Sequence, residues 1–282
     1  MPDCGVASSG PGVDYEQQGA RYHRTRGRTT GTAAYEAPVR RELAGAPDGP
    51  LLDLGSGTGV WSPHLAAWSG RPVLAVEPAA GMRAATPAPP AAWTESEDPR
   101  RAGMPAGGDG VGRPVTPGGP VLQVGGRGGA LPLRDDAAGA AWLSTVIHHV
   151  GDLDVCAREL RRVLVTGAPI LIRNAFPGRY DGLAITRFFP GSRRAIERMP
   201  SVEAVRDAFG RAGFGFAGIG RIDEPPVDLR VWRGQLADQR RADTALIHLT
   251  DDEFAAGLRA LDEAIAGGTA ATPVGLDLLV LR

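Results

Sequence analysis

The segment LLDLGSGTG at residues 51–59 constrains the fold more than any other part of this sequence. Four residues that suit a buried strand, 51–54, run directly into three glycines at alternate positions, and a helix-compatible segment follows from residue 60. Glycine accepts a positive φ and lets a ligand approach the backbone, while the first amides of a following helix supply hydrogen-bond donors. This order predicts a strand, a tight turn and a helix start. The carboxylate of Asp53 would lie at the strand end, where open α/β sheets bind their ligands.

The spacing of these glycines distinguishes between classes of nucleotide-like ligand. A dinucleotide fingerprint, G-x-G-x-x-G, that starts at Gly55 would place its third glycine at the position of Val60. The second predicted strand, 72–76, is followed by Glu77, about 20 residues beyond the turn, where an acidic side chain can accept both hydroxyls of a ribose. The sequence therefore disfavours a nicotinamide-dependent oxidoreductase, which stays as a competing hypothesis.

The pattern D-x-G-x-G-x-G resembles motif I of the class I S-adenosylmethionine-dependent methyltransferases, of the small-molecule, natural-product or ubiquinone-biosynthesis type. In that family the loop faces the methionine part of the cofactor, and an acid at the place of Glu77 holds the ribose. The resemblance implies that S-adenosyl-L-methionine binds here and leaves as S-adenosyl-L-homocysteine. The cofactor site implied in this part of the chain consists of Asp53, Gly55, Ser56, Gly57, Thr58, Gly59, Glu77, Pro78 and Met82.

Many methyltransferases of this kind begin with a pattern similar to the polar and aromatic segment 15–26, and in them the segment lies over the cofactor as a helical lid. By this match Tyr22 and Arg26 would approach the carboxylate of the cofactor, since the paired N–H donors of arginine suit a carboxylate. Tyr15 would contact the acceptor. A solvated amphipathic helix whose tyrosines cover the core is an equally good interpretation of the same residues.

The expected adenine contact departs from the family pattern. A third strand is predicted at 121–124, and the segment 126–133 follows it. Related methyltransferases carry, at the position of Arg127, an aspartate that accepts from the adenine amino group, and arginine offers no acceptor. The contact is therefore lost or replaced in this chain, while a backbone N–H near Gly128 could still reach the ring.

The fourth predicted strand and its exit loop, 140–149, would bring Ser144 and Thr145 to the cofactor and two histidines to the acceptor. Similar proteins have a histidine in this place, which makes His149 the first candidate for a general base and His148 the second. A neutral imidazole can take a proton from a hydroxyl or an amine. A histidine that only holds the loop by hydrogen bonding is an equally good hypothesis, because many methyltransferases work mainly by alignment.

A fifth strand is predicted at 168–173, with Asn174 and Phe176 at its exit on the ligand edge, where both would bind the acceptor. From residue 177 the pattern changes to loops and helices, and the resemblance implies that such insertions build the acceptor pocket. Phe188 and Phe189 would line that pocket, unless they are core aromatics.

These segments together predict an α/β fold: a Rossmann-like, doubly wound sheet of seven mostly parallel strands with an antiparallel last strand, an N-terminal helical lid and a helical acceptor cap. We expect a disordered tail at 1–13, the lid at 14–46 and the methyltransferase domain at 47–282, with cap helices at about 177–268. The segment 84–119, rich in proline, alanine and glycine, is predicted to be a disordered insertion, and a loop that gates the acceptor is the functional alternative.

The composition limits the classes of molecule that this chain is expected to bind. The formal net charge of −1 gives no field that would attract nucleic acid, and no apolar run approaches a membrane span. Two cysteines and the absence of a secretory signal indicate a cytoplasmic protein, and no spacing of Cys and His suggests a metal site. We expect a small-molecule acceptor as the partner, with a homodimer left open.

The sequence thus predicts a methyltransferase that acts on a small molecule, in specialised metabolism. The main alternative keeps the fold and the cofactor but replaces methyl transfer by a rearrangement or cyclisation. The identity of the acceptor and the attacked atom, O, N or C, do not follow from the sequence.

Overall fold

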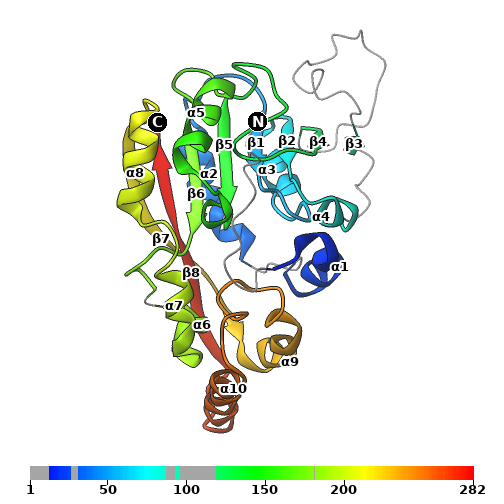
Figure 1. Cartoon of the computed structure of the whole chain (residues 1–282), viewed down its shortest axis with the longest axis vertical. Coiled ribbons are helices and arrows are strands. Elements are labelled where there is room, and N and C mark those ends of the chain that lie inside the picture. The colour runs from blue at the N-terminus through cyan, green and yellow to red at the C-terminus, as the bar shows by residue number, and fades with distance from the viewer. Residues whose placement is uncertain (1–12, 27–30, 87–92, 96–118, 181) are drawn as a thin grey trace.

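The computed structural model describes residues 13–26, 31–86, 93–95, 119–180 and 182–282 (Figure 1). The expected disordered tail falls outside these residues except for its last member, Val13. Most of the insertion at 84–119 also lies outside them.

One sheet of eight strands organises the chain, in the order β3-β4-β2-β1-β5-β6-β8-β7. All pairs are parallel except those of β8, which runs antiparallel to both β6 and β7. The mostly parallel, Rossmann-like arrangement with an antiparallel last strand is therefore confirmed. The strands are β1 (Leu51–Leu54), β2 (Val73–Val76), β3 (Trp93–Glu95), β4 (Val121–Val124), β5 (Ala140–Ser144), β6 (Ile170–Asn174), β7 (Phe216–Asp228) and β8 (Ala271–Leu281).

Two strands differ from the expectation. The short strand β3 lies within the predicted insertion and pairs in parallel with β4 at the edge of the sheet, so it adds an eighth strand to the seven expected. Strand β7 lies within the range 177–268 expected for cap helices, and it follows β8 along most of its length, with irregularities in register at two places.

Helices cover both faces of the sheet and its ligand edge (Figure 1). The longer ones are α1 (Tyr15–Arg26), α2 (Glu36–Leu43), α3 (Ser62–Ser69), α5 (Leu153–Val163), α8 (Val202–Arg211), α9 (Leu229–Gln239) and α10 (Asp251–Ala266). The shorter ones are η1 (Thr32–Tyr35), α4 (Ala80–Ala84), η2 (Ile147–His149), α6 (Ala184–Phe188), η3 (Pro190–Ser192) and α7 (Arg193–Ile196). No helix of the described part of the chain is both long and apolar enough to cross a membrane.

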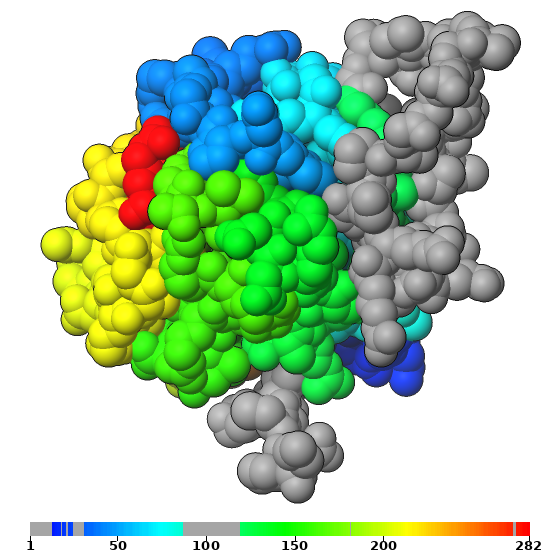
Figure 2. All heavy atoms as spheres, turned by 90° about the horizontal axis from the view of Figure 1, so that it is seen from above, coloured from blue at the N-terminus to red at the C-terminus, as the bar shows by residue number. Residues whose placement is uncertain are grey.

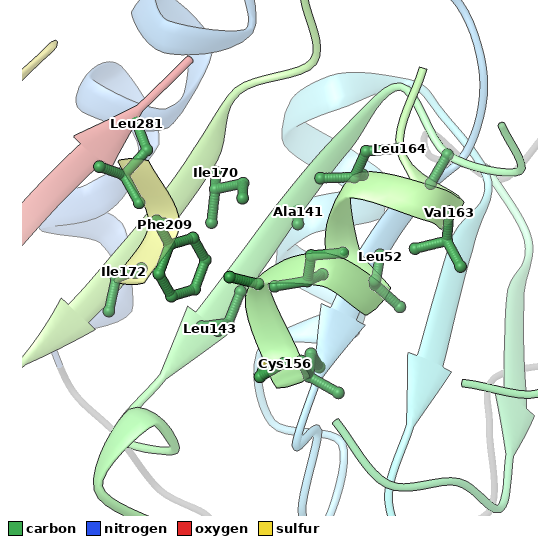
Figure 3. Packing of buried hydrophobic residues seen from close by; sticks show 14 of the residues in the cluster. Leu52, Ala141, Leu143, Cys156, Val163, Leu164, Ile170, Ile172, Phe209 and Leu281 are labelled. Atoms are coloured by element: carbon green, nitrogen blue, oxygen red, sulfur yellow. The ribbon is translucent and has the colours of Figure 1, made fainter. Parts of the chain in front are cut away.

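The central strands are buried on both faces, as parallel strands between two helical layers must be. On one face α5 and α8 pack through Cys156, Leu160 and Phe209 against Leu143 and Ile172 (Figure 3). Helix α8 therefore belongs to this core layer, although it falls within the range expected for the acceptor cap.

The opposite face is covered by η1, α2 and α3, and it is aromatic. Tyr35, Trp61 and Trp142 form a cluster of edge-on and tilted rings with centroids 4.9–6.0 Å apart. The C-terminus of the chain lies beside α2, where Arg282 donates to Glu42 at 2.9 Å (Figure 2).

A long ribbon of β7 and β8 places the cap. Strand β6 pairs only with residues 277–281 of β8, so the rest of β8 and its partner β7 project beyond the carboxyl ends of the parallel strands. Helices α9 and α10 are inserted between β7 and β8 at this projecting end, and with α6 they enclose a separate apolar cluster. Figure 1 shows these helices and α1 gathered at the ligand edge of the sheet.

Candidate functional site

The glycine loop after β1 has the conformation that its sequence predicts. Gly55, Gly57 and Gly59 have φ values of 69°, 58° and 71°. Residues with a Cβ atom rarely adopt this left-handed region, so each turn needs glycine. The loop therefore turns the chain sharply at the end of β1, before α3 begins at Ser62.

Glu77 fixes this loop from the end of the neighbouring strand β2. Its buried carboxylate accepts the N–H of Gly57 at 3.0 Å and that of Ala79 at 2.9 Å. Burial raises the pKa of Glu77, while these two hydrogen bonds and the guanidinium of Arg83 oppose the rise. Each carboxylate oxygen has two lone pairs, so both oxygens keep an acceptor position for the hydroxyls of a ribose.

Asp53 is placed behind the loop. Ser62 donates to its carboxylate at 2.6 Å, and burial raises the pKa of Asp53 to about 7. The pair joins the end of β1 to the first residue of α3, and so holds both ends of the glycine loop.

Three more residues that the resemblance implicates differ in their surroundings. The hydroxyl of Ser56 is buried without a hydrogen-bond partner among the described residues, which is uncommon for a polar atom in a protein interior. Thr58 shares a 3.2 Å hydrogen bond with His23 of α1. Met82, which is buried, would meet a Cβ atom at Gly57 at 3.3 Å, so its side chain covers that part of the loop.

Helix α1 lies on α4 at the ligand edge, in the position expected of the lid. Glu16 accepts the N–H groups of Ala80 at 3.2 Å and of Gly81 at 3.0 Å, at the N-terminus of α4. A Cβ atom at Gly19 would meet Gly81 O at 2.1 Å, and one at Gly81 would meet Glu16 O at 1.8 Å. The two backbones therefore touch at a crossing that requires glycine on both sides.

A cavity of about 130 Å³ lies between this helix, the ends of β5 and β6, and the cap. Its polar lining comes from the lid, the strand ends and the segment after α9: Tyr15, Tyr22, Thr145, His148, His149, Asn174, Asp243 and Thr244. Its apolar lining comes mainly from the cap side: Leu183, Ile185, Ile196 and Met199. Because β5 is the direct neighbour of β1, the cavity is at the same sheet edge as the glycine loop.

The two predicted bases lie in η2, at the floor of this cavity. Tyr15 and Nε2 of His149 share a 2.9 Å hydrogen bond. Nδ1 of His148 lies 3.1 Å from Oδ1 of Asn174, and the two imidazole centroids are 4.1 Å apart. Crowding by protein atoms lowers the pKa of His149, although part of that residue remains exposed to solvent. The imidazole of His149 is therefore neutral near neutral pH.

Ser144 and Thr145 end β5 in different environments. The hydroxyl of Ser144 accepts from Arg173 at 3.3 Å, on the face away from the cavity. Thr145 has a positive φ of 52° and donates its backbone N–H to Arg173 O at 2.7 Å, and it lines the cavity.

Two residues predicted near the adenine, Arg127 and Gly128, do not line this cavity. Arg127 is exposed in a short bridge with Ala130, and Gly128 packs near Cys156 and Leu54. Arg26 ends α1, and its side chain lies outside the described part of the structure.

The three phenylalanines proposed for the acceptor pocket do not line the cavity. Phe176 is fully buried in the core with α5 and α8. Phe188 and Phe189 belong to the apolar cluster of the cap, where Phe189 stacks on Phe254 at 5.5 Å. Their large apolar rings are used to hold the cap together, so the pocket expectation is corrected for them.

A buried ion pair that sequence reasoning missed supports the floor of the site. Arg173 donates to Glu224 at 2.6 Å, and the hydroxyl of Tyr35 donates to the same carboxylate at 2.8 Å. Burial raises the pKa of Tyr35 to about 12. The group joins β6, β7 and η1 one residue before Asn174. No local pattern marks it, because its members are far apart in the chain.

Arg83 and Glu16 were also missed. Arg83 donates to the carbonyls of Glu77 and Pro78 at 2.6 and 2.8 Å, and its guanidinium lies over Gly125. It thereby connects the exits of β2 and β4. The only sequence signal for Glu16 was its acidic side chain in the first turn of the predicted lid.

Comparisons with known proteins bear on the fold. No protein-family model matches the chain, and no curated protein does. A solved putative methyltransferase from an antibiotic biosynthesis pathway of Anabaena variabilis is 18% identical over 87% of this chain and 96% of its own, with a TM-score of 0.59. The (4+2)-cyclase SpnF is 18% identical over 91% and 83%, with a TM-score of 0.51.

A third similar structure is the geranyl diphosphate C-methyltransferase of Streptomyces coelicolor. It is 16% identical over 99% of this chain and 89% of its own, with a TM-score of 0.50. The strand order, the antiparallel last strand and the similarity to these solved structures all indicate the same fold. This chain has the fold of the class I S-adenosylmethionine-dependent methyltransferases.

Proposed function

We propose that this protein is an S-adenosylmethionine-dependent methyltransferase that acts on a small-molecule acceptor. The observation that carries the proposal is the glycine loop held by the buried carboxylate of Glu77, at the same sheet edge as a cavity with two histidines. The loop amides and the hydroxyl of Ser56, which has no hydrogen-bond partner in the described part of the chain, offer polar groups where a zwitterionic ligand would lie. These residues fit S-adenosylmethionine.

In this proposal Glu77 accepts the ribose hydroxyls, and the loop from Gly55 to Gly59 faces the methionine part. Tyr22 and Arg26 of the lid hold the carboxylate. Met82, Pro78 and Gly128 contact the adenine. When bound, S-adenosylmethionine would supply a methyl group that is already activated by its positive sulfur.

The protein's own task is then alignment. The apolar side chains of the cap line one side of the cavity, and Tyr15 and Tyr22 of the lid line another. Fixing an acceptor at near-attack distance supplies much of the rate of such a displacement. The small cavity and its mixed lining favour a compact acceptor with one polar end. We also propose that the acceptor belongs to specialised metabolism, which the antibiotic-pathway neighbour supports.

A second candidate is a non-methylating rearrangement or cyclisation in the same cavity. It is favoured by Arg127 in place of an acid, and SpnF shows that a cyclase can have this fold. Both candidates need the cofactor pocket, but only one consumes the methyl group.

Calorimetric titration with S-adenosylhomocysteine, and with NAD as the control, tests the pocket. We expect binding of the first and none of the second. Incubation with methyl-labelled S-adenosylmethionine and a panel of small hydroxylated and amine acceptors then tests the reaction by mass spectrometry. Binding of NAD alone would overturn the proposal, whereas cofactor binding with conversion of an acceptor and no label would favour the cyclisation candidate.

A further inference from the structure

Helix α6 and the residue before it line two cavities. The first is the cavity of the candidate site, and the second is an open cavity of about 540 Å³. Leu183 lines both of them, and Ile185 lines only the first. Ala184, Thr186 and Arg187 line only the second. Because successive side chains of a helix point about 100° apart, this short helix forms a wall with one side in each cavity.

Two arginines line the second cavity, Arg187 of α6 and Arg193 at the start of α7. No acidic side chain of the described residues lines it. Within the described part of the chain, neither guanidinium forms an ion pair or a hydrogen bond with another residue. The cavity therefore presents two positive charges without a carboxylate in its described lining.

Aromatic rings hold both guanidinium groups. That of Arg193 lies over the ring of Tyr180, 5.1 Å from its centroid, and that of Arg187 lies over the ring of Phe188, also at 5.1 Å. Such contacts restrict a long side chain but use none of its N–H groups in a hydrogen bond to oxygen. An arginine has five of these donors, so both side chains keep donors for a ligand.

The acidic side chains of the neighbouring elements are already paired with other arginines. Glu253 of α10 accepts from Arg194 at 2.8 Å. Asp277 of β8, whose side chain is fully buried, accepts from Arg179 at 2.8 Å and from Arg221 at 3.2 Å. These carboxylates therefore do not balance the charges in the second cavity.

We propose that this second cavity is a binding site for a phosphoryl group, which Arg187 and Arg193 bind through their N–H donors. Arginine forms paired hydrogen bonds with phosphate oxygens. A phosphate monoester carries a charge of about −1.5 to −2 near neutral pH, which two guanidinium groups balance, whereas one arginine is enough for a carboxylate. The volume of the cavity also leaves space for an organic group attached to the phosphate.

Calorimetric titration of the full chain with phenyl phosphate and with inorganic phosphate tests the site, with phenol as the uncharged control. We expect both phosphates to bind and phenol not to bind. Tighter binding of phenyl phosphate would identify an organic phosphate as the ligand, and equal affinities would identify free phosphate. Binding of neither phosphate would overturn the proposal.

Arginine variants locate the bound phosphate. Arg187→Gln and Arg193→Gln should each weaken binding by about tenfold or more, as expected for the loss of a charge-assisted hydrogen bond. Arg194→Gln is the matched control, because it removes a positive charge from the same helix at a residue that does not line the cavity. It should keep the affinity of the wild-type protein. Binding that is insensitive to the first two variants, or equally weakened in the control, would overturn the proposal.

Asp181 is the one acidic residue in the sequence 180–193, and it lies outside the described residues. Asp181→Asn should therefore be titrated in parallel. A gain in phosphate affinity of about tenfold or more would show that this carboxylate neutralises the two arginines in the wild-type protein, and it would overturn the proposal. A smaller change is expected.

Kinetics with phosphorylated and unphosphorylated members of the acceptor panel show what carries the phosphate. A KM that rises in Arg187→Gln for the phosphorylated acceptor alone would place the group on the acceptor, and an unchanged KM would identify a separate ligand. The binding measurements use neither cofactor nor acceptor. Failure to detect methyl transfer would therefore count against the proposed function and leave the phosphate site as measured.

Discussion

Replacing Glu77 by glutamine tests whether this acid holds both the loop and a ligand. The carboxylate accepts the N–H groups of Gly57 and Ala79, and a glutamine side chain has only one accepting oxygen. One backbone donor would then face an NH₂ group. Losing a hydrogen bond to a charged group costs about 1.5–3 kcal/mol of folding free energy. A lost ribose contact of similar strength would weaken binding of S-adenosylhomocysteine by roughly 10- to 100-fold.

Two measurements separate these effects: the free energy of unfolding in urea and the Kd for S-adenosylhomocysteine by calorimetry. Ser62→Ala is the matched control, because it removes the 2.6 Å hydrogen bond to Asp53 behind the same loop without touching the proposed ligand position. The control should lose stability and keep its Kd. If Glu77→Gln is destabilised like the control and also keeps its Kd, the carboxylate is only a support for the loop, and the cofactor has been placed wrongly.

Three further changes test the surroundings of the site. Gly81→Val should prevent α1 from packing on α4, since a Cβ atom at this position meets Glu16 O. Residues 15–24 should then exchange their amide hydrogens faster than in the control Gly151→Ala, whose added Cβ atom meets no other atom. Glu224→Leu leaves Arg173 buried without this carboxylate and should lower the free energy of unfolding in urea by about 3–5 kcal/mol. The double variant Arg173→Leu/Glu224→Leu should recover a large part of that loss. If the losses of the two single variants simply add in the double variant, the pairing is contradicted. Asp53→Asn should remove a pH dependence of the folding stability. Burial raises the folded-state pKa of Asp53 from 3.8 to about 7, so the stability that this group contributes is present below pH 4 and is lost as the pH rises towards 7. The slope of this loss is at most about 1.4 kcal/mol per pH unit. Unfolding of both proteins across this range that gives parallel curves would show that Asp53 does not titrate there.

The parts of the fold that local sequence determines were predictable. The strand, turn and helix at 51–69 combine an apolar run with glycines that only one backbone conformation explains, and the lid and most strands follow from similar local patterns. The use of the aromatic residues was not predictable in this way. Phe188 and Phe189 could line a pocket or fill a core, and only the packing of α9 and α10 against α6 decides for the core.

The site illustrates the same division. Its ligand edge follows from strand order, because Asp53, Ser144 and Asn174 all end parallel strands or lie beside such ends. The different hydrogen-bond partners of His148 and His149 do not follow from strand order, since two adjacent histidines in one loop look equivalent in the sequence. A backbone carbonyl distinguishes them: Ala175 O orients Asn174, and Asn174 in turn orients the proton on His148. The position of the proton on a histidine can thus be set by a main-chain group that carries no sequence signal. If this is correct, Ala175 can be replaced by serine or valine without changing the tautomer of His148, whereas any residue at 174 that cannot accept from Nδ1 will change it.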